Sequence, residues 1–358
     1  MLNVIFSLDY EIHGNGEGCS HELMVEPTRR MLDLFDRFGA KLTIMADVAE
    51  ILKFKEYKEQ FGRDDYHYEA IAEQLRDALR RGHDIQLHLH SSYFNAEFKD
   101  GRWAQDWQEY NFAGLPFERL DVMVRTGKRY LEDLLKPVAP EYECTAFRAA
   151  NWSVSPSRNV VRALVNNAFR IETSVFKHGR RQGLVNFDYS NAHSDLIPWP
   201  VDEEDICRRN DSGKLIEVPI YSEQRWIGAF LSPGRIYRTK MTRAHSVADY
   251  YPGPAPGSSA STSAPRKVLN KLSMLTRLHA WKADFNQCTG RQLIGAVKRV
   301  DRKYLNPSAA LPFVLIGHSK QFTTENERSL QPFLEYVGAH EARYKFANLS
   351  QTAVENRN

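Results

Sequence analysis

Short apolar runs of strand length alternate with helical segments along most of this chain. We predict strands near residues 2–9, 41–46, 84–90, 144–148, 168–172, 215–220 and 312–317. Helices are predicted near residues 27–38, 68–81, 117–135, 156–167, 289–304 and 324–339. Strands and helices that alternate in this way form a parallel sheet, either wound open or closed into a barrel. Because α/β barrels routinely use one domain for a length such as these 358 residues, a single domain over 1–358 is expected.

The first apolar run ends in two carboxylates, Asp9 and Glu11. Alternate residues of a strand share a face, so the two side chains project together from the carboxyl end of the strand. A charge is costly to bury unless it is paired or bound to a metal, and strand ends are where parallel α/β folds keep their chemistry. The alternative is a strand that has already left the core, with both acids in water.

The third predicted strand ends in an H-x-H pair, His88 and His90. Neutral imidazole is the commonest side-chain ligand for zinc and similar metals. Two histidines and a carboxylate from another strand end would leave coordination positions open, as a catalytic zinc site requires. The alternative is a pair of histidines bonded to neighbouring backbone. His83 lies before this strand, on the other side of the turn, and we expect it to be structural.

Two further strand ends carry an arginine and a histidine. Arg148 is always protonated, so beside the carboxylates it would hold one of them ionised. His318 ends the last long apolar run, where a histidine can act as a general acid at neutral pH. An ion pair and a buried, hydrogen-bonded histidine are the structural alternatives. Four strand ends with these residues in sequence order nevertheless favour one shared site.

As a set, these motifs resemble those of the polysaccharide deacetylases with the nodulation-protein homology domain, carbohydrate esterase family four. The resemblance covers roughly residues 2–350, and its four motifs match segments 7–11, 82–88, 147–152 and 316–319. Segments 41–45 and 172–175 also resemble strands of that family. The resemblance implies an α/β fold, a distorted (β/α)7 barrel. It also implies that Asp9 is the general base, that Arg148 tunes Asp9, and that His318 is the general acid.

The resemblance further implies one divalent metal, zinc with cobalt or iron as alternatives, held by Glu11 and His88. The second histidine of the family motif would fall at Ser92. We therefore predict His90 as the third ligand, because its i, i+2 spacing from His88 permits it. These roles support metal-assisted hydrolysis of an amide bond, with the metal polarising the carbonyl and activating water.

The predicted activity is N-deacetylation of an acetamido sugar, or a close relative such as deformylation. The alternative is a barrel that binds a sugar without catalysis, its metal site eroded at Ser92. A glycosidase that uses Asp9 and Glu11 is less favoured. Acids one residue apart on one strand face lie closer than the ~5 Å or more that glycosidases use.

The substrate is expected to be an anionic amino sugar. Its charged group is either a diphosphate that links it to a nucleotide or a polyprenyl chain, or a uronic-acid carboxylate. Guanidinium groups present paired donors to oxyanions, and the loop after a barrel strand lies beside the active site. The alternative is a solvated charge run. The residues predicted to bind substrate follow two strand ends, and they are Asn151, Trp152, Lys177, Arg180 and Arg181.

Length and composition agree with a soluble enzyme, and the net charge of +3 gives no support to a nucleic-acid partner. The sequence begins directly in a strand and shows no leader or membrane-spanning run, which predicts a cytoplasmic step in O-antigen or capsule assembly. Residues 250–265 are rich in Pro, Gly and Ser and predict a mobile loop. Residues 266–282 predict a basic helix packed on the barrel, or alternatively a helix that contacts phospholipid at the inner membrane surface. Four cysteines without C-x-x-C spacing predict reduced thiols.

Overall fold

The computed structural model describes residues 1–247, 250, 277–304 and 309–355. Its main sheet is curled and mostly parallel, and strands follow one another in the order β1 (Leu2–Tyr10), β2 (Leu42–Asp47), β3 (Asp84–Leu89), β6 (Ala146–Ala149), β7 (Ile171–Glu172) and β11 (Ile216–Glu217). β14 (Leu311–His318) pairs with the other side of β1. A parallel bridge between Ile220 and Val314 joins the segment after β11 to β14 and brings the two ends of the sheet together. The predicted distorted (β/α)7 barrel is confirmed.

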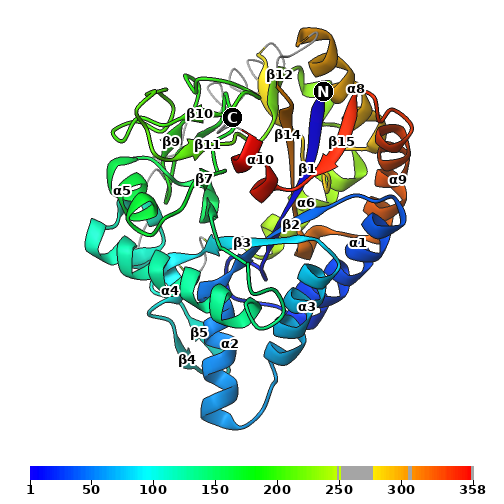
Figure 1. The fold of residues 1–358 in the computed structure, drawn as a ribbon. Coiled ribbons are helices and arrows are strands. Elements are labelled where there is room, and N and C mark those ends of the chain that lie inside the picture. The colour runs from blue at the N-terminus through cyan, green and yellow to red at the C-terminus, as the bar shows by residue number, and fades with distance from the viewer. Residues whose placement is uncertain (248–249, 251–276, 305–308, 356–358) are drawn as a thin grey trace, which may run out of the picture.

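Helices surround this sheet in Figure 1. Those that were predicted are α1 (Glu26–Arg37), α3 (Tyr68–Arg80), α4 (Phe117–Leu135), α5 (Arg158–Asn166), α8 (Gly290–Lys303) and α9 (Thr324–Gly338). Their starts are encoded locally: Pro27 stands in the first turn of α1, and capping boxes begin α8 at Thr289 and α9 at Thr323. Each helix buries an apolar face, and every residue of β1, β2 and β3 is buried beneath them.

Several elements were not predicted. Three are helices: α2 (Val48–Phe61), α6 (Pro233–Ala244) and α10 (Leu349–Glu355). Two strands extend the main sheet, β10 (Trp199–Pro200) beside β11 and β15 (Tyr344–Ala347) beside β1. The others form two-stranded sheets: β4 (Glu97–Lys99) with β5 (Arg102–Ala104), β8 (Arg180–Arg181) with β9 (Phe187–Asp188), and β12 (Ser222–Arg225) with β13 (His279–Lys282).

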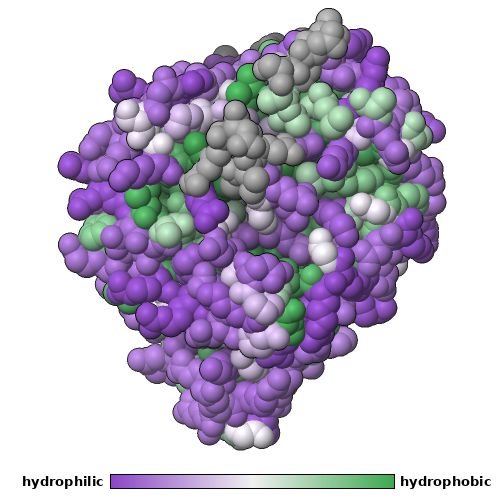
Figure 2. Space-filling model, in the orientation of Figure 1, coloured by the Kyte–Doolittle hydropathy of each residue, from purple (hydrophilic) through white to green (hydrophobic). Residues whose placement is uncertain are grey.

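The predicted basic helix over 266–282 is wrong at its carboxyl end. Residues 279–282 form β13, which pairs antiparallel with β12 and buries Trp281. Residues 266–276 lie outside the described residues, and so does the predicted loop at 250–265 apart from Tyr250. In the described part of the chain, no helix combines the length and apolarity needed to cross a bilayer. The face in Figure 2 is mainly hydrophilic, with small hydrophobic areas between polar ones.

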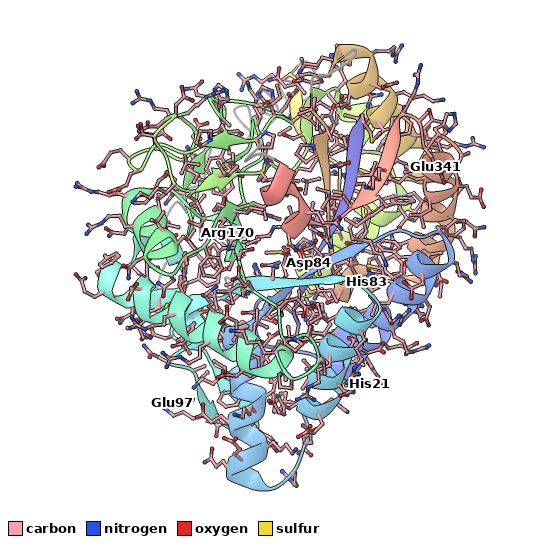
Figure 3. The ribbon with its side chains drawn as sticks, in the orientation of Figure 1. His21, His83, Asp84, Glu97, Arg170 and Glu341 are labelled. Atoms are coloured by element: carbon pink, nitrogen blue, oxygen red, sulfur yellow. The ribbon has the colours of Figure 1, made fainter. Side chains whose placement is uncertain are left out.

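His83 stands at the turn before β3, next to Asp84 (Figure 3), and is almost completely buried. The backbone N–H of Leu42 donates to His83 Nδ1 (3.1 Å), which places the ring proton on Nε2. Nε2 in turn lies 3.0 Å from Asp36 Oδ1. Burial lowers the pKa of His83 to about 4, although Asp36 opposes the shift. The ring is therefore neutral at pH 7 and ties β2 to α1, in keeping with the structural role expected for it.

A buried neutral His83 should make the fold sensitive to mild acid. Because its pKa is lower in the folded chain than in the unfolded chain, its contribution to stability is intact above about pH 6.5 and is lost as the pH falls towards 4. By pH 5 this loss is about 2 kcal/mol. Urea unfolding of the wild type and His83→Gln at pH 7 and pH 5 measures it. The variant should lose less stability between the two pH values; equal losses would contradict the assignment.

Candidate active site

The carboxyl ends of β1, β3, β6 and β14 bring the predicted site residues together. Register in the sheet places Asp9 opposite His318 and His88 opposite Arg148. A cavity of about 200 Å³ opens at these strand ends. Five of the predicted catalytic and metal-binding residues line it, namely Asp9, Glu11, His88, His90 and His318.

Asp9 forms an ion pair with the fully buried Arg148, whose Nη1 donates to Asp9 Oδ1 (2.7 Å). The rest of the guanidinium is fixed by Ser7 Oγ (2.8 Å) and by the backbone carbonyl of Thr173 (2.9 Å). Burial by itself would raise the pKa of Asp9, but the charges of Arg148, His88 and His318 together outweigh it, and the pKa lies below its usual range. Asp9 is thus held as a carboxylate at the edge of the cavity.

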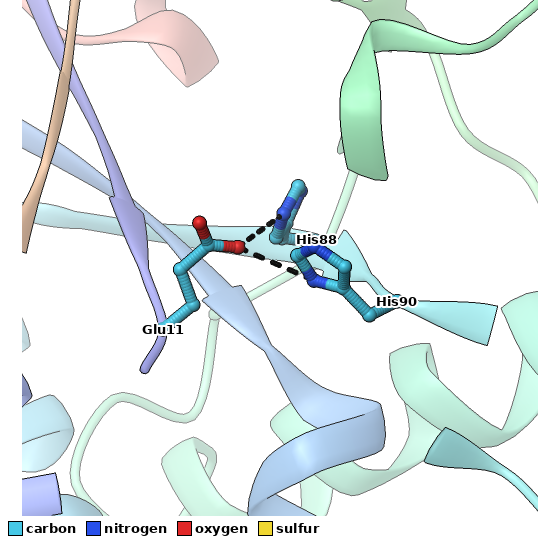
Figure 4. A group of neighbouring side chains, drawn as sticks. All are labelled: Glu11, His88 and His90. Carbon is cyan, nitrogen blue, oxygen red and sulfur yellow. Dashed lines mark hydrogen bonds and ion pairs between the residues drawn. The ribbon is translucent and has the colours of Figure 1, made fainter. Parts of the chain in front are cut away.

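Glu11, His88 and His90 form a buried group that could hold a metal ion (Figure 4). One carboxylate oxygen, Glu11 Oε2, lies 3.1 Å from His88 Nε2 and 3.2 Å from His90 Nδ1. The three possible ligand atoms lie within 4.8 Å of one another. His88 Nδ1 bonds the backbone carbonyl of Arg148 (2.9 Å), which leaves Nε2 to face the group. One carboxylate and two imidazoles are a donor set that suits zinc and similar divalent ions.

His90, and not Ser92, reaches this group. Ser92 is buried away from the cavity, where its hydroxyl donates to Gln105 Oε1 (2.8 Å). His90 also contacts the buried Asp47, which accepts from the His90 backbone N–H (3.0 Å) and lies 2.8 Å from its Nδ1. Asp47 therefore orients the His90 ring, and an ion at Nδ1 would compete with this contact.

Lys320 lies against the same group and was not predicted. Its Nζ is 2.5 Å from Glu11 Oε1 and donates to the backbone carbonyl of Ile12 (2.7 Å). Burial would raise the pKa of Glu11, but Lys320, His90 and His88 lower it well below its usual range. Glu11 is therefore ionised and already has a cation beside it. The available signal was position, since Lys320 follows His318 by two residues at the same strand end.

Replacing Lys320 with Met should tighten the binding of a divalent ion. The substitution removes a positive charge that competes for Glu11, and two charges about 4 Å apart at an effective dielectric constant near 20 interact by about 4 kcal/mol. We expect at least about a tenfold lower dissociation constant for zinc, since 1.4 kcal/mol is tenfold. Competition with a chromogenic chelator measures it, with the surface variant Lys136→Met as control. Unchanged or weaker binding in Lys320→Met would contradict the prediction.

His318 closes the other side of the cavity. Its Nε2 lies 3.5 Å from Asp9 Oδ2, and its backbone N–H donates to Asn286 Oδ1 (2.6 Å). Burial lowers the pKa of His318 to about 4, with Asp9 opposing the shift and Arg238 adding to it. At neutral pH the ring is therefore neutral in this state. A role as general acid requires that His318 first receives a proton.

Two of the predicted substrate residues, Asn151 and Trp152, line the cavity. Both have φ near 57°, which is strained for a residue as large as tryptophan. Tyr189 holds this turn, because its hydroxyl donates to the Trp152 carbonyl (2.6 Å) and accepts from the Val154 N–H (3.1 Å). The Trp152 ring stands edge-on to His318, 6.1 Å between ring centroids.

The three basic residues predicted to bind substrate, Lys177, Arg180 and Arg181, do not all lie at the cavity. Arg181 lines the cavity, where it donates to Asn151 Oδ1 (2.9 Å). Arg180 instead points to Asp188 and Ser190 on the exposed β8–β9 hairpin. The Lys177 side chain is not part of the cavity lining.

No protein-family model matches the sequence, and no curated protein matches it either. Among solved structures, the chain is similar to a provisionally named glycoside hydrolase/deacetylase from Parabacteroides distasonis, with a TM-score of 0.54 at 11% identity over 99% of this chain and 71% of that one. It is also similar to a GH57-type branching enzyme from Pyrococcus horikoshii, with a TM-score of 0.52 at 11% identity over 99% and 70%. A provisionally named polysaccharide deacetylase from Mycobacterium smegmatis aligns with a TM-score of 0.49 at 14% identity over 99% and 90%. The first two likenesses establish the barrel fold, and function has to be argued from the site.

Proposed function

We propose that this barrel is a metal-dependent hydrolase that removes an acyl group from the nitrogen of an amino sugar. The observation that supports it is a buried carboxylate, Asp9, held ionised by Arg148 beside a separate Glu–His–His group in the same cavity. A carboxylate in this state can accept a proton, and the Glu–His–His group can hold a Lewis acid. Amide hydrolysis needs both functions within reach of one carbonyl.

The residues of the site have separate roles in the proposed reaction. An ion held by Glu11, His88 and His90 would polarise the acyl carbonyl and lower the pKa of the attacking water. Asp9 accepts the proton of that water as the water oxygen adds to the carbonyl carbon. The proton passes to His318, whose Nε2 lies 3.5 Å from Asp9, and from there to the leaving nitrogen. The C–N bond breaks, and the products are a free amine and a carboxylic acid.

The ionised carboxylates of the site favour amide hydrolysis over glycoside hydrolysis. Glycoside hydrolysis is the alternative to test, because a branching enzyme has the same fold. Among the described residues, the carboxylates that line the cavity are Asp9 and Glu11. Nearby cations hold the pKa of each below its usual range. A glycosidase needs one protonated carboxylic acid to release the leaving-group oxygen. Two ionised carboxylates do not supply it.

The finer assignment is an acetamido sugar of O-antigen or capsule polysaccharide, deacetylated in the cytoplasm or at the inner membrane surface with zinc, cobalt or iron. Its support is the resemblance of the strand-end motifs to polysaccharide deacetylases and the donor set of the Glu–His–His group. The neutral, partly aromatic lining at Asn151 and Trp152 offers a surface for a sugar ring.

Product analysis tests this proposal. The purified chain, reconstituted with each metal in turn, is incubated with N-acetylated amino-sugar glycosides. We expect acetate and a free amine without new reducing ends. New reducing ends without acetate would overturn the proposal in favour of glycoside hydrolysis.

A further inference from the structure

A second cavity adjoins the catalytic one, and much of its lining is cationic. It has a volume of about 500 Å³ and shares Trp152, Arg238 and Thr242 with the catalytic cavity. Its other cationic lining residues are Arg235, Arg243 and Lys282. A molecule that fills both cavities would pass beside Trp152, whose ring stands edge-on to His318 and has the Lys282 ammonium over it.

Two elements supply these cations. Arg235, Arg238 and Arg243 lie on α6 at spacings that place them on one side of a helix. The α6 sequence contains no acidic residue. Lys282 ends β13, the strand that pairs with β12. Their convergence therefore depends on the tertiary fold, because α6 and β13 are separated by more than thirty residues in the sequence.

Lys282 has an unusual environment for an ammonium group. Its Nζ lies 3.4 Å from the centroid of the Trp152 ring and 4.4 Å from that of Phe176. Within the described ranges, it forms no ion pair with a carboxylate. Burial lowers the pKa of Lys282 well below its usual range, and the neighbouring Arg238 adds to this. An anion in the cavity would relieve both effects.

The other cations are only partly neutralised. Arg238 pairs with the buried Asp284, Nη1 to Oδ2, at 3.0 Å. The Arg235 guanidinium lies over the Phe230 ring at 4.4 Å and, among the residues described, has no carboxylate in an ion pair with it. Four cationic side chains therefore line the cavity, and in the described part of the chain one of them pairs with a carboxylate, which leaves a net positive site.

We propose that the second cavity binds the phosphate or diphosphate group of the substrate through Arg235, Arg238 and Lys282, while the acylated sugar occupies the catalytic cavity. The position of the sugar rests on the proposed function. Two guanidinium groups offer paired donors to tetrahedral oxyanions, and an ammonium adds a compact point charge. This site takes the role that sequence reasoning gave to Lys177 and Arg180, which lie outside both cavities.

Binding of inorganic pyrophosphate to the metal-free chain tests the site directly. Calorimetry at low salt should show binding that weakens as salt is added. Lys282→Met and Arg235→Gln keep most of the side-chain volume and should each weaken binding about tenfold, as expected for loss of a charged contact. Lys240→Met is the matched control, because Lys240 is exposed on α6 and lines neither cavity. Absent binding, or equal binding in all four proteins, would overturn the proposal.

A second comparison separates this proposal from the proposed function. Pyrophosphate binding needs neither metal nor turnover, so it should persist even in a chain that hydrolyses no amide. Acetate release with equal kcat/KM from a neutral sugar and its diphosphate-linked form would overturn the phosphate site and leave amide hydrolysis standing. Comparing UDP-linked with isoprenoid-diphosphate-linked acetamido sugar identifies the carrier, since preference for either one over the neutral sugar supports the site.

Discussion

Asp9→Asn should lower kcat for amide hydrolysis by about 10²- to 10⁴-fold, the usual contribution of a general base. The amide side chain keeps the size of Asp9 but cannot accept the proton of the attacking water. It also leaves the buried Arg148 without its counter-ion, which costs about 3–5 kcal/mol of stability. The bound metal should remain, because Asp9 is not part of the Glu–His–His group.

Turnover at saturating metal and metal content by mass spectrometry are measured on the same sample. Asp188→Asn, on the exposed β8–β9 hairpin, is the matched control and should behave as the wild type. Thermal unfolding shows whether the Asp9 variant is folded at the assay temperature. A folded Asp9→Asn protein that retains both metal and full turnover would refute the role of Asp9.

His90→Ala should weaken zinc binding by at least about 100-fold, because even residues that only support ligands contribute about 10- to 100-fold. His88→Ala should do the same, since both imidazoles face Glu11 Oε2. Ser92→Ala should leave zinc affinity nearly unchanged, because the Ser92 hydroxyl is bonded to Gln105 outside the cavity.

Zinc affinities of the three variants are compared by competition with a chelator under identical conditions. Hydrolysis should fall together with affinity at a fixed zinc concentration and recover in part at higher zinc. Strong loss in Ser92→Ala with little loss in His90→Ala would instead place the third ligand at the usual position of the family motif.

The strand order was predictable because each barrel strand is a buried apolar run with a turn signal near it. α2 was missed because no Gly or Pro separates β2 from Val48, so the strand runs directly into the helix. β13 was misread because leucines at helical spacing precede Trp281, whereas the partner strand β12 lies far earlier in the sequence. Pairing over such a distance leaves no local pattern.

The candidate site also contains residues with a local sequence signal and residues whose positions depend on tertiary packing. Asp9, Glu11, His88, His90, Arg148 and His318 could be predicted because each one lies in a strand or directly after it, and the ends of parallel strands converge. Arg238 and Lys282 could not, because their positions depend on how α6 and β13 pack over the barrel mouth. Lys320 was overlooked, although it follows His318 by two residues at the same strand end. The low pKa of His318 also depends on tertiary burial and on charges distant in sequence.

Zinc titration of the stripped chain, followed by acetate release from an N-acetylated amino sugar, tests the central claim most directly. We predict no release without metal, a rise in rate with added zinc, and a plateau at one equivalent. Glu11→Ala should stay inactive at that equivalent, because it lacks the carboxylate that His88 and His90 both face. Release by the stripped chain would contradict a metal-dependent mechanism, and no release with one zinc bound would indicate a barrel that binds its sugar without hydrolysing it.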